Sequence, residues 1–315
     1  MLQCDAQRLR TVLDWEALIA ALREMFATGC ESPTRHHHTV PVPGEPDATL
    51  LLMPAWRRGA YLGVKIVNVF PSNSDRGQPA VRAAYLLSSA RDGEILALLD
   101  GGELTARRTA AASALAAGFL ARADTRRLLV VGTGRLAGNL AAAHSCVRAL
   151  DSIRVWGRHA DKAGSVAKAL AREGLPAKPA GDLAQEVEAA DIVTCATLST
   201  EPLVKGEWLR PGTHLDLVGG FRPDMREADD EAVRRASVFV DTFAGACSEA
   251  GDIVQPLASG VLKEEAIAAD LTQLCAGEAE GRTGDDQITL FKSVGASLED
   301  LAAAILAYEQ LRKTP

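Results

Sequence analysis

The sequence predicts an α/β protein with two domains, a doubly wound parallel sheet and an α+β unit that precedes it. Its 315 residues are too many for one ordinary core and favour about two domains of ~150 residues each. From Arg126 onward, strand and helix patterns alternate, which is typical of a parallel sheet with helices on both faces. Before Arg126, apolar stretches separated by turn residues predict antiparallel strands.

Composition and charge exclude several classes of protein. Hydrophobic residues make up 47% and charged residues 24% of the chain, the usual balance of a globular protein. The net charge of −7 gives no basic footprint for nucleic acid or an anionic membrane, and an aromatic content of 4% gives few rings for stacking on single strands. No apolar run reaches the ~18 residues of a membrane span, and the first residues lack the features of a signal peptide. We therefore expect a cytoplasmic protein that binds neither nucleic acid nor membranes.

The first part of the chain begins with a helix and continues as strands. Residues 14–28 carry apolar side chains at helical spacing behind Asp14, which can cap the helix. Prolines in residues 32–43 favour an extended segment. Alternation along the strand around Lys65 favours an outward-facing lysine. The expected strands are 49–54, 61–70, 81–88 and 95–100.

The histidines and cysteines do not form the pattern of a metal site. The adjacent His36, His37 and His38 would point to alternate faces of an extended chain, and no cysteine or acidic partner lies at ligand spacing. The six cysteines are scattered without a C-x-x-C pair. We expect no metal site and no disulfide framework.

An alanine-rich helix is expected over residues 103–122. Arg107 and Arg108 lie near its start, where a cation opposes the helix dipole, so at least one of them needs an anionic partner. A substrate carboxylate and an ordinary surface Asp or Glu both satisfy that need.

The stretch Leu128–Gly138 predicts a phosphate-binding turn. An apolar strand runs into Gly132-Thr133-Gly134, and a helix of small residues follows. The glycines allow a tight turn and a close approach of a pyrophosphate, while Ala137 allows close packing of helix against strand. The phosphates would bind the free N–H groups at the start of the helix.

The remaining elements complete a doubly wound domain. The loops at 197–200 and 219–221 fall at the carboxyl edge of the sheet, where such folds bind ligands. The expected strands are 153–157, 177–178, 191–196, 214–218 and a last one at 237–241, with helices over 162–173 and 183–189.

The end of the second strand favours NADP(H) over NAD(H). A carboxylate at this place would hold the ribose hydroxyls of NAD(H). The strand instead ends at Gly157-Arg158-His159, where no carboxylate repels a phosphate and a guanidinium is able to bind one.

Several blocks of the chain resemble the ornithine cyclodeaminase and mu-crystallin family. They are Gly63–Asn68, Leu104–Ala111, Gly132–Gly134 and Ile288–Gly295, in the family's order over nearly the whole length. The resemblance implies a substrate-binding and dimerisation domain over residues 1–122 with 290–315, and a Rossmann NAD(P)-binding domain over 123–289. It also implies a homodimer built from the N-terminal domain, to which the helix 297–311 returns, and an active site in the cleft facing the Rossmann domain.

The resemblance assigns roles to individual residues. Arg35 and Arg108 clamp a substrate carboxylate, and Lys65 stands beside the reacting carbon, which replaces the outward orientation expected from alternation. Lys65 would donate a proton or stabilise the substrate by its charge. The expected cofactor-binding residues are Gly132, Thr133, Gly134, Arg135, Leu136, Arg158, His159, Thr197, Val218 and Lys292.

One position departs from the cyclodeaminases of this family. They have an aspartate after a Gly-Gly at a strand end, where this chain has Phe221, and a phenyl ring cannot accept a proton or bind an ammonium. The segment 222–227 looks more like mu-crystallin and related imine reductases.

We therefore predict an NADPH-dependent reductase of small cyclic ketimine or imino acids, of the pyrroline-2-carboxylate or piperideine-2-carboxylate type. The substrate's carboxylate would bind Arg35 and Arg108, and a hydride would reduce its C=N bond. One alternative is a cyclodeaminase or alanine dehydrogenase-like enzyme of amino acids. Another is a protein that holds NADPH without turnover.

Overall fold

The computed structural model describes residues 1–313, apart from the side chain of Ser74. The chain divides into two compact units, Met1–Arg108 with the C-terminal segment from Ala296 onward, and Thr109–Gly295. The sequence places the domain boundaries at 122/123 and 289/290, whereas the compact units divide within helix α3 (Gly101–Leu120) and just after strand β14 (Ile288–Lys292).

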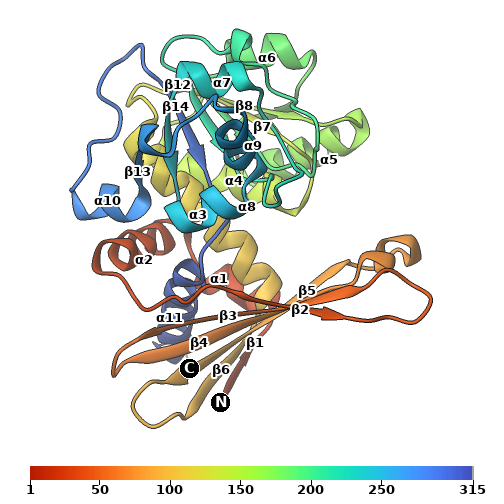
Figure 1. Cartoon of the computed structure of the whole chain (residues 1–315), viewed down its shortest axis with the longest axis vertical. Coiled ribbons are helices and arrows are strands. Elements are labelled where there is room, and N and C mark those ends of the chain that lie inside the picture. The colour runs from red at the N-terminus through yellow and green to blue at the C-terminus, as the bar shows by residue number, and fades with distance from the viewer. Residues whose placement is uncertain (314–315) are drawn as a thin grey trace. The chain divides into compact units, whose positions relative to one another are not determined.

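The first unit is built on a six-stranded sheet (Figure 1). Its strand order is β1-β6-β5-β4-β3-β2, and all pairs are antiparallel except β1 with β6. The expected antiparallel strands are present, and the short β1 and α1 were not predicted. The strands are β1 (Leu2–Cys4), β2 (His36–Val40), β3 (Ala48–Arg57), β4 (Tyr61–Val69), β5 (Val81–Ser89) and β6 (Ile95–Asp100). The helices are α1 (Ala6–Val12), α2 (Trp15–Thr28), the 3₁₀ turn η1 (Pro71–Arg76) and α11 (Ser297–Lys313).

Helices α2 and α11 pack against each other, and α11 covers one face of this sheet. Asp14 caps α2 by accepting a hydrogen bond from the Ala17 amide at 2.9 Å, as the sequence predicts. On β4, Gly63, Lys65 and Val67 are buried on the covered face. The alternation of β4 is therefore as expected, but the outward orientation of Lys65 is wrong because the lysine lies on the helix-covered face.

The second unit is built on an eight-stranded parallel sheet with the order β13-β12-β14-β11-β10-β7-β8-β9 (Figure 1). The fold class is thus α/β with a dinucleotide-type sheet, as predicted. The strands are β7 (Arg127–Val131), β8 (Ser152–Trp156), β9 (Ala177–Pro179), β10 (Ile192–Cys195), β11 (His214–Leu217), β12 (Ala236–Val240), β13 (Ile267–Asp270) and β14. The helices are α3, α4 (Arg135–Val147), α5 (Ala160–Arg172), α6 (Leu183–Ala189), α7 (Asp230–Arg235), α8 (Phe243–Glu249), α9 (Gly251–Ser259) and α10 (Leu271–Ala276), with 3₁₀ turns η2 (Gly206–Trp208) and η3 (Glu264–Ala266).

The prediction that β12 is the last strand is wrong. Two later strands join the sheet, and β14 inserts between β11 and β12. The strand β13 is only four residues long and alanine-rich, and β14 is buried along its whole length, so neither carries the alternation that marks a half-buried strand.

The order of the strands places a topological switch point beside β7. The chain runs from β7 through α4 to β8 on one side, whereas β10 lies on the other side of β7. Open parallel sheets bind ligands at such a switch point, outside the carboxyl ends of the strands. The turn at Gly132 and the loop at Thr197 lie at these two strand ends.

Candidate functional site

A cluster of four buried charges lies between β4, α3 and α11 in the first unit. The Lys65 Nζ atom is 2.7 Å from Asp300 Oδ2. Arg108 donates from Nε to Asp300 Oδ1 at 2.9 Å and from Nη1 to Glu299 Oε2 at 2.7 Å. Lys65 is 2% exposed, Arg108 4%, and both carboxylates are fully buried. Asp300 therefore holds a lysine and an arginine in fixed positions.

The charges in this cluster set the proton affinity of Lys65. Burial lowers the pKa of Lys65 to about 8, Asp300 opposes that effect, and the cations Arg108 and Arg35 add to it. Burial also acts against the Asp300 carboxylate, but Arg108 and Lys65 keep the pKa of Asp300 below its usual value. Asp300 pairs with both cations of the cluster, so its carboxylate stays ionised while the lysine titrates in a range useful for proton transfer.

The sequence predicted Lys65 and Arg108 as site residues but did not predict the other two members of the cluster, the carboxylates of α11. The anionic partner of Arg108 is neither a substrate nor a surface acid but the buried pair Glu299 and Asp300. The neighbouring Arg107 donates to the Leu13 carbonyl and stacks over the Trp15 ring. The available signal was the pair of acidic residues in the first turn of α11, directly before the apolar stretch 301–307.

Arg35 and the histidine triplet lie at the edge of the first sheet that β2 forms. Arg35 is half-buried just before β2, near enough for its charge to act on Lys65. All five residues of β2, His36, His37 and His38 among them, are exposed. Within residues 1–313 there is no group of three or more His, Cys, Asp or Glu placed to hold a metal ion.

The predicted phosphate turn of the second unit is a tight glycine turn between β7 and α4. Gly132 has φ of +131°, and a side chain there would lie 2.6 Å from the Ala196 carbonyl oxygen, so only glycine is accommodated. Gly134 caps α4 without a side-chain hydrogen bond, and open space surrounds its Cα. The start of α4 therefore carries no side chain at Gly134, and the binding of a pyrophosphate at this place stays a prediction.

The expected adenosine end lies beside this turn. Gly157 follows β8 and packs on Thr133, since a side chain at Gly157 would lie 2.5 Å from Thr133 Cγ2. Arg158 and His159 come next and are exposed. The structure thus brings the turn and the guanidinium of Arg158 into neighbouring loops at one edge of the sheet.

Two predicted cofactor residues are buried in the sheet rather than open at its edge. Val218 is 6% exposed, and Lys292 is fully buried with its Nζ 2.9 Å from Asp252 Oδ2. Lys292 already has an anionic partner, and its role in cofactor binding stays a prediction. Phe221 is 47% exposed in the loop after β11. Sequence reasoning did not find Asp252 or the nearby Glu227, because no motif marks a carboxylate whose partners are backbone amides.

Known proteins share both units of this chain. The sequence matches the model of the ornithine cyclodeaminase/mu-crystallin family over residues 5–315. A Delta(1)-pyrroline-2-carboxylate reductase of Paracoccus denitrificans is 38% identical over 295 residues, covering 93% of this chain and 91% of that protein.

Solved structures agree over the full length. The Delta(1)-pyrroline-2-carboxylate reductase of Thermococcus litoralis, in complex with NADH and L-proline, has a TM-score of 0.92 at 34% identity, covering 99% of this chain and 98% of that one. An archaeal alanine dehydrogenase dimer with bound NAD has a TM-score of 0.90 at 28% identity, covering 100% and 97% of the two chains.

The fold and these relatives define the class of the protein, an NAD(P)-dependent oxidoreductase that acts on carbon–nitrogen bonds. The chain belongs to the ornithine cyclodeaminase/mu-crystallin family, which confirms the resemblance seen in its sequence. Within residues 1–313, no helix has the length and apolar character needed to cross a membrane.

Proposed function

We propose that this protein is an NADPH-dependent reductase of small cyclic imino acids of the pyrroline-2-carboxylate or piperideine-2-carboxylate type. The observation that carries the proposal is the buried Lys65–Asp300–Arg108 cluster. In this cluster Lys65 can supply a proton, and Arg108 can bind a carboxylate. Relatives of this chain are reductases of a cyclic imino acid. When bound, NADPH supplies the hydride that reduces the carbon of the C=N bond.

Arg108 and Arg35 are proposed to hold the substrate carboxylate. Asp300 and Glu299 occupy Nε and Nη1 of Arg108 and fix the plane of its guanidinium, while Nη2 takes part in neither contact. A planar guanidinium held in one orientation binds a carboxylate with little loss of side-chain entropy. The carboxylate then fixes the orientation of the neighbouring C=N carbon, which supplies much of the rate.

Lys65 is proposed to act on the substrate nitrogen. With a pKa of about 8, its ammonium is present at neutral pH and can give up a proton as the imine becomes an amine. Lys65 acts either as this proton donor or through its positive charge. A solvent isotope effect on kcat distinguishes the roles, because only a proton donor transfers a solvent-exchangeable proton during the reaction.

The choice of NADPH rests on Arg158. Its exposed guanidinium follows β8 beside the glycine turn, where a 2′-phosphate would meet a cation and no carboxylate. The neighbour from Thermococcus litoralis carries NADH, so the comparison between cofactors has to be measured. Titration with both nucleotides, followed by nicotinamide fluorescence, is expected to give at least tenfold tighter binding of NADPH, and tighter NADH binding contradicts the preference.

A homodimer is proposed through the uncovered face of the first sheet. Val64, Leu86 and Leu98 lie side by side in register on β4, β5 and β6, on the face opposite Lys65. Leu98 is 37% exposed, and an uncovered apolar sheet face favours burial against a second copy. Light scattering of the purified protein is expected to give twice the mass of 33.2 kDa.

The assay that tests the function is NADPH oxidation with a panel of cyclic imino acids. Oxidation with the five- or six-membered 2-carboxylates supports the proposal. Ammonia release from ornithine or oxidation of alanine indicates the amino acid enzymes instead, although the phenyl ring of Phe221 gives no carboxylate for such amine chemistry. Bound NADPH without oxidation on any imino acid indicates a protein that only holds the cofactor.

A further inference from the structure

Three loops at the carboxyl edge of the second sheet lie in close contact at two glycines, Gly132 and Gly219. A side chain at Gly132, after β7, would lie 2.6 Å from the Ala196 carbonyl oxygen, after β10. A side chain at Gly219, after β11, would collide with the backbone of Thr197 and with Glu227 Oε1. The phosphate turn, the Thr197 loop and the Gly219 loop therefore form one stack, in which a shift of one loop displaces the next.

Glu227 joins two of these loops. Its Oε1 atom accepts hydrogen bonds from the Thr197 amide at 2.6 Å and the Thr197 hydroxyl at 2.8 Å. Its Oε2 atom accepts one from the Gly219 amide at 2.7 Å. Glu227 is fully buried, so water does not replace these contacts. A single carboxylate thus satisfies two backbone amides that the ends of β10 and β11 would otherwise leave unpaired.

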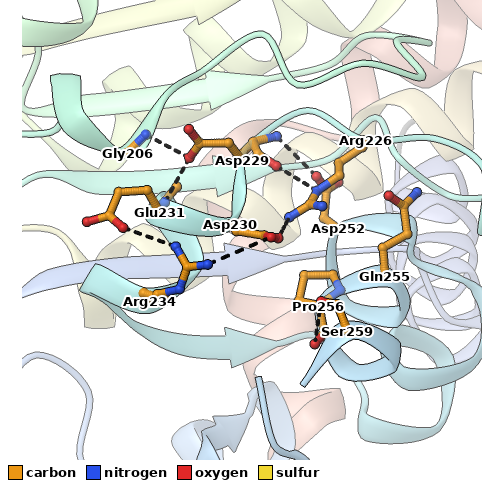
Figure 2. A network of polar contacts seen from close by, with 12 residues as sticks. Gly206, Arg226, Asp229, Asp230, Glu231, Arg234, Asp252, Gln255, Pro256 and Ser259 are labelled. Atoms are coloured by element: carbon orange, nitrogen blue, oxygen red, sulfur yellow. Dashed lines mark hydrogen bonds and ion pairs between the residues drawn. The ribbon is translucent and has the colours of Figure 1, made fainter. Parts of the chain in front are cut away.

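The segment on either side of Glu227 is held firmly (Figure 2). Arg226 donates to the Ala228 carbonyl and forms an ion pair with Asp230. Asp229 caps α7 by accepting from the Ala232 amide at 2.9 Å and also accepts from the Gly206 amide at 2.8 Å. These contacts anchor the backbone that carries Glu227, and the Arg226 amide also donates to the Ser199 carbonyl of the Thr197 loop at 2.8 Å.

The charges around Glu227 are not balanced. Asp252 on α9 accepts from the Glu227 amide at 2.7 Å and pairs with Lys292 of β14 at 2.9 Å. Two buried carboxylates thus lie near one ammonium, which contacts Asp252 and acts on Glu227 through its charge. The buried Cys195 thiol of β10 also faces this cluster, together with the buried Asp216 carboxylate of β11. Burial raises the pKa of Glu227 to about 7, with Asp252 adding to the rise and Lys292 and the Thr197 donors opposing it.

We propose that Glu227 is the positioning residue of the cofactor site, which in its ionised form holds the Thr197 and Gly219 loops in the arrangement that binds the nucleotide. The proposal rests on the dinucleotide binding in the proposed function. Oε1 already accepts two hydrogen bonds, so a proton on that oxygen displaces a Thr197 donor, whereas a proton on Oε2 weakens that oxygen as the acceptor for the Gly219 amide. Protonated Glu227 therefore releases one of the two loops and weakens nucleotide binding.

The test is nucleotide affinity against pH in the wild type and in Glu227→Gln. NADH is the main probe, because the 2′-phosphate of NADPH ionises near pH 6 and would add its own pH dependence. Wild-type affinity for NADH is expected to fall several-fold between pH 8 and pH 6. Glutamine has one acceptor oxygen and one donor amide, so Glu227→Gln is expected to bind about tenfold more weakly at pH 8, with no further change at pH 6.

A matched control is Glu186→Gln, the same substitution in the same unit. Glu186 accepts from the Gly181 amide at 3.2 Å and lines a hollow at the amino ends of β7 and β8, away from the cofactor edge. This variant is expected to keep the wild-type affinity and its pH dependence. Thr197→Val removes only one of the three hydrogen bonds, so it is expected to bind about threefold more weakly and to keep the pH dependence.

The outcomes separate this proposal from the proposed function. NADH affinity in the wild type that is constant from pH 8 to pH 6 overturns the positioning role even if Glu227→Gln fails to fold. A folded Glu227→Gln with wild-type affinity also overturns it, while leaving the reductase assignment intact. Wild-type protein that binds neither NADH nor NADPH overturns both.

Discussion

The two units each bury a cluster of charges, and the clusters differ in their balance. In the first unit, Lys65 and Arg108 face Glu299 and Asp300, so two cations meet two anions. In the second unit, Glu227 and Asp252 share Lys292, so one negative charge is in excess. The paired cations keep the Asp300 carboxylate ionised and leave the lysine as the group that titrates, whereas burial and the nearby Asp252 charge raise the pKa of Glu227.

This difference in charge balance suits the two clusters to different roles, proton transfer in the first unit and the positioning of loops in the second. The balanced cluster offers a cation with a pKa of about 8, which suits a proton donor at neutral pH. In the unbalanced cluster, both Glu227 oxygens accept from backbone amides, and the Asp252 oxygens bind an amide and Lys292. These carboxylates are therefore engaged within the protein and are not offered to a substrate. Substitutions in the two clusters should therefore change different measured quantities.

The largest effect is expected from Lys65→Ala. Removal of the ammonium is expected to lower kcat by about 10²- to 10⁴-fold, the usual contribution of a positioned proton donor. NADPH affinity should stay the same, because the cofactor turn belongs to the other unit. Steady-state kinetics and fluorescence titration measure the two quantities, and Lys205→Ala, at an exposed lysine over Trp208, is the control. Unchanged kcat in Lys65→Ala would remove the lysine from the chemistry.

The next effect contrasts Asp300→Asn with Asp252→Asn. Loss of the Asp300 charge leaves a buried excess of one positive charge, which is expected to cost about 3–5 kcal/mol in the free energy of unfolding. Loss of the Asp252 charge leaves the Lys292 charge balanced by that of Glu227 and is expected to cost less, about 1–3 kcal/mol for the hydrogen bonds. Urea unfolding of the two variants measures the difference. Equal losses would show that charge balance does not govern these clusters.

The pH dependence of stability should have opposite signs for the two clusters. The pKa of Lys65 is lowered, so between about pH 8 and 10.5 the unfolded chain binds more protons, and Lys65 makes stability rise with pH there. The pKa of Glu227 is raised, so its stabilising effect is full below pH 4.5 and is lost as pH rises through about 7. Melting temperatures of the wild type, Lys65→Met and Glu227→Gln are measured against pH. Each variant is expected to lose the pH dependence of stability that comes from its own substituted residue and to keep that of the other. A variant that keeps its window would place the titration on another group.

The smallest effect is expected from Glu299→Gln. Glu299 is paired with Arg108, while Asp300 is the carboxylate paired with Lys65. The high-pH limb of kcat should therefore keep its midpoint in Glu299→Gln, while KM for the imino acid rises a few-fold as Arg108 loosens. In Asp300→Asn the same limb is expected to move to lower pH, because the anion that favours the lysine proton is gone. A shifted limb in Glu299→Gln would mean that the two carboxylates act on Lys65 alike.

The sequence predicted most of the fold because its signals are local. The glycine turn, the cap at Asp14 and the strand–helix alternation each depend on a few neighbouring residues, and each is present. The strands β13 and β14 were missed because a fully buried or very short strand has no alternation. The same cause hid the face of Lys65, since only the packing of α11 decides which side of a sheet is covered.

The partners of the site residues were harder to predict than the residues themselves. Family blocks identified Lys65 and Arg108, but Asp300 lies 192 positions beyond Arg108 in the chain. Glu227 binds backbone amides of Thr197 and Gly219, which have no side-chain signature in a sequence. Contacts between distant segments and contacts to backbone appear only once the chain is folded.

The reductase assignment is tested most directly by following the hydride itself. NADPH deuterated at the transferred position of its nicotinamide, incubated with pyrroline-2-carboxylate and the protein, is expected to give proline with one deuterium on the carbon of the former C=N bond. Mass spectrometry of the product measures this incorporation, with Lys65→Ala as the control that binds cofactor but forms little proline. Proline without deuterium, or no proline at all while NADPH is bound, would contradict the account.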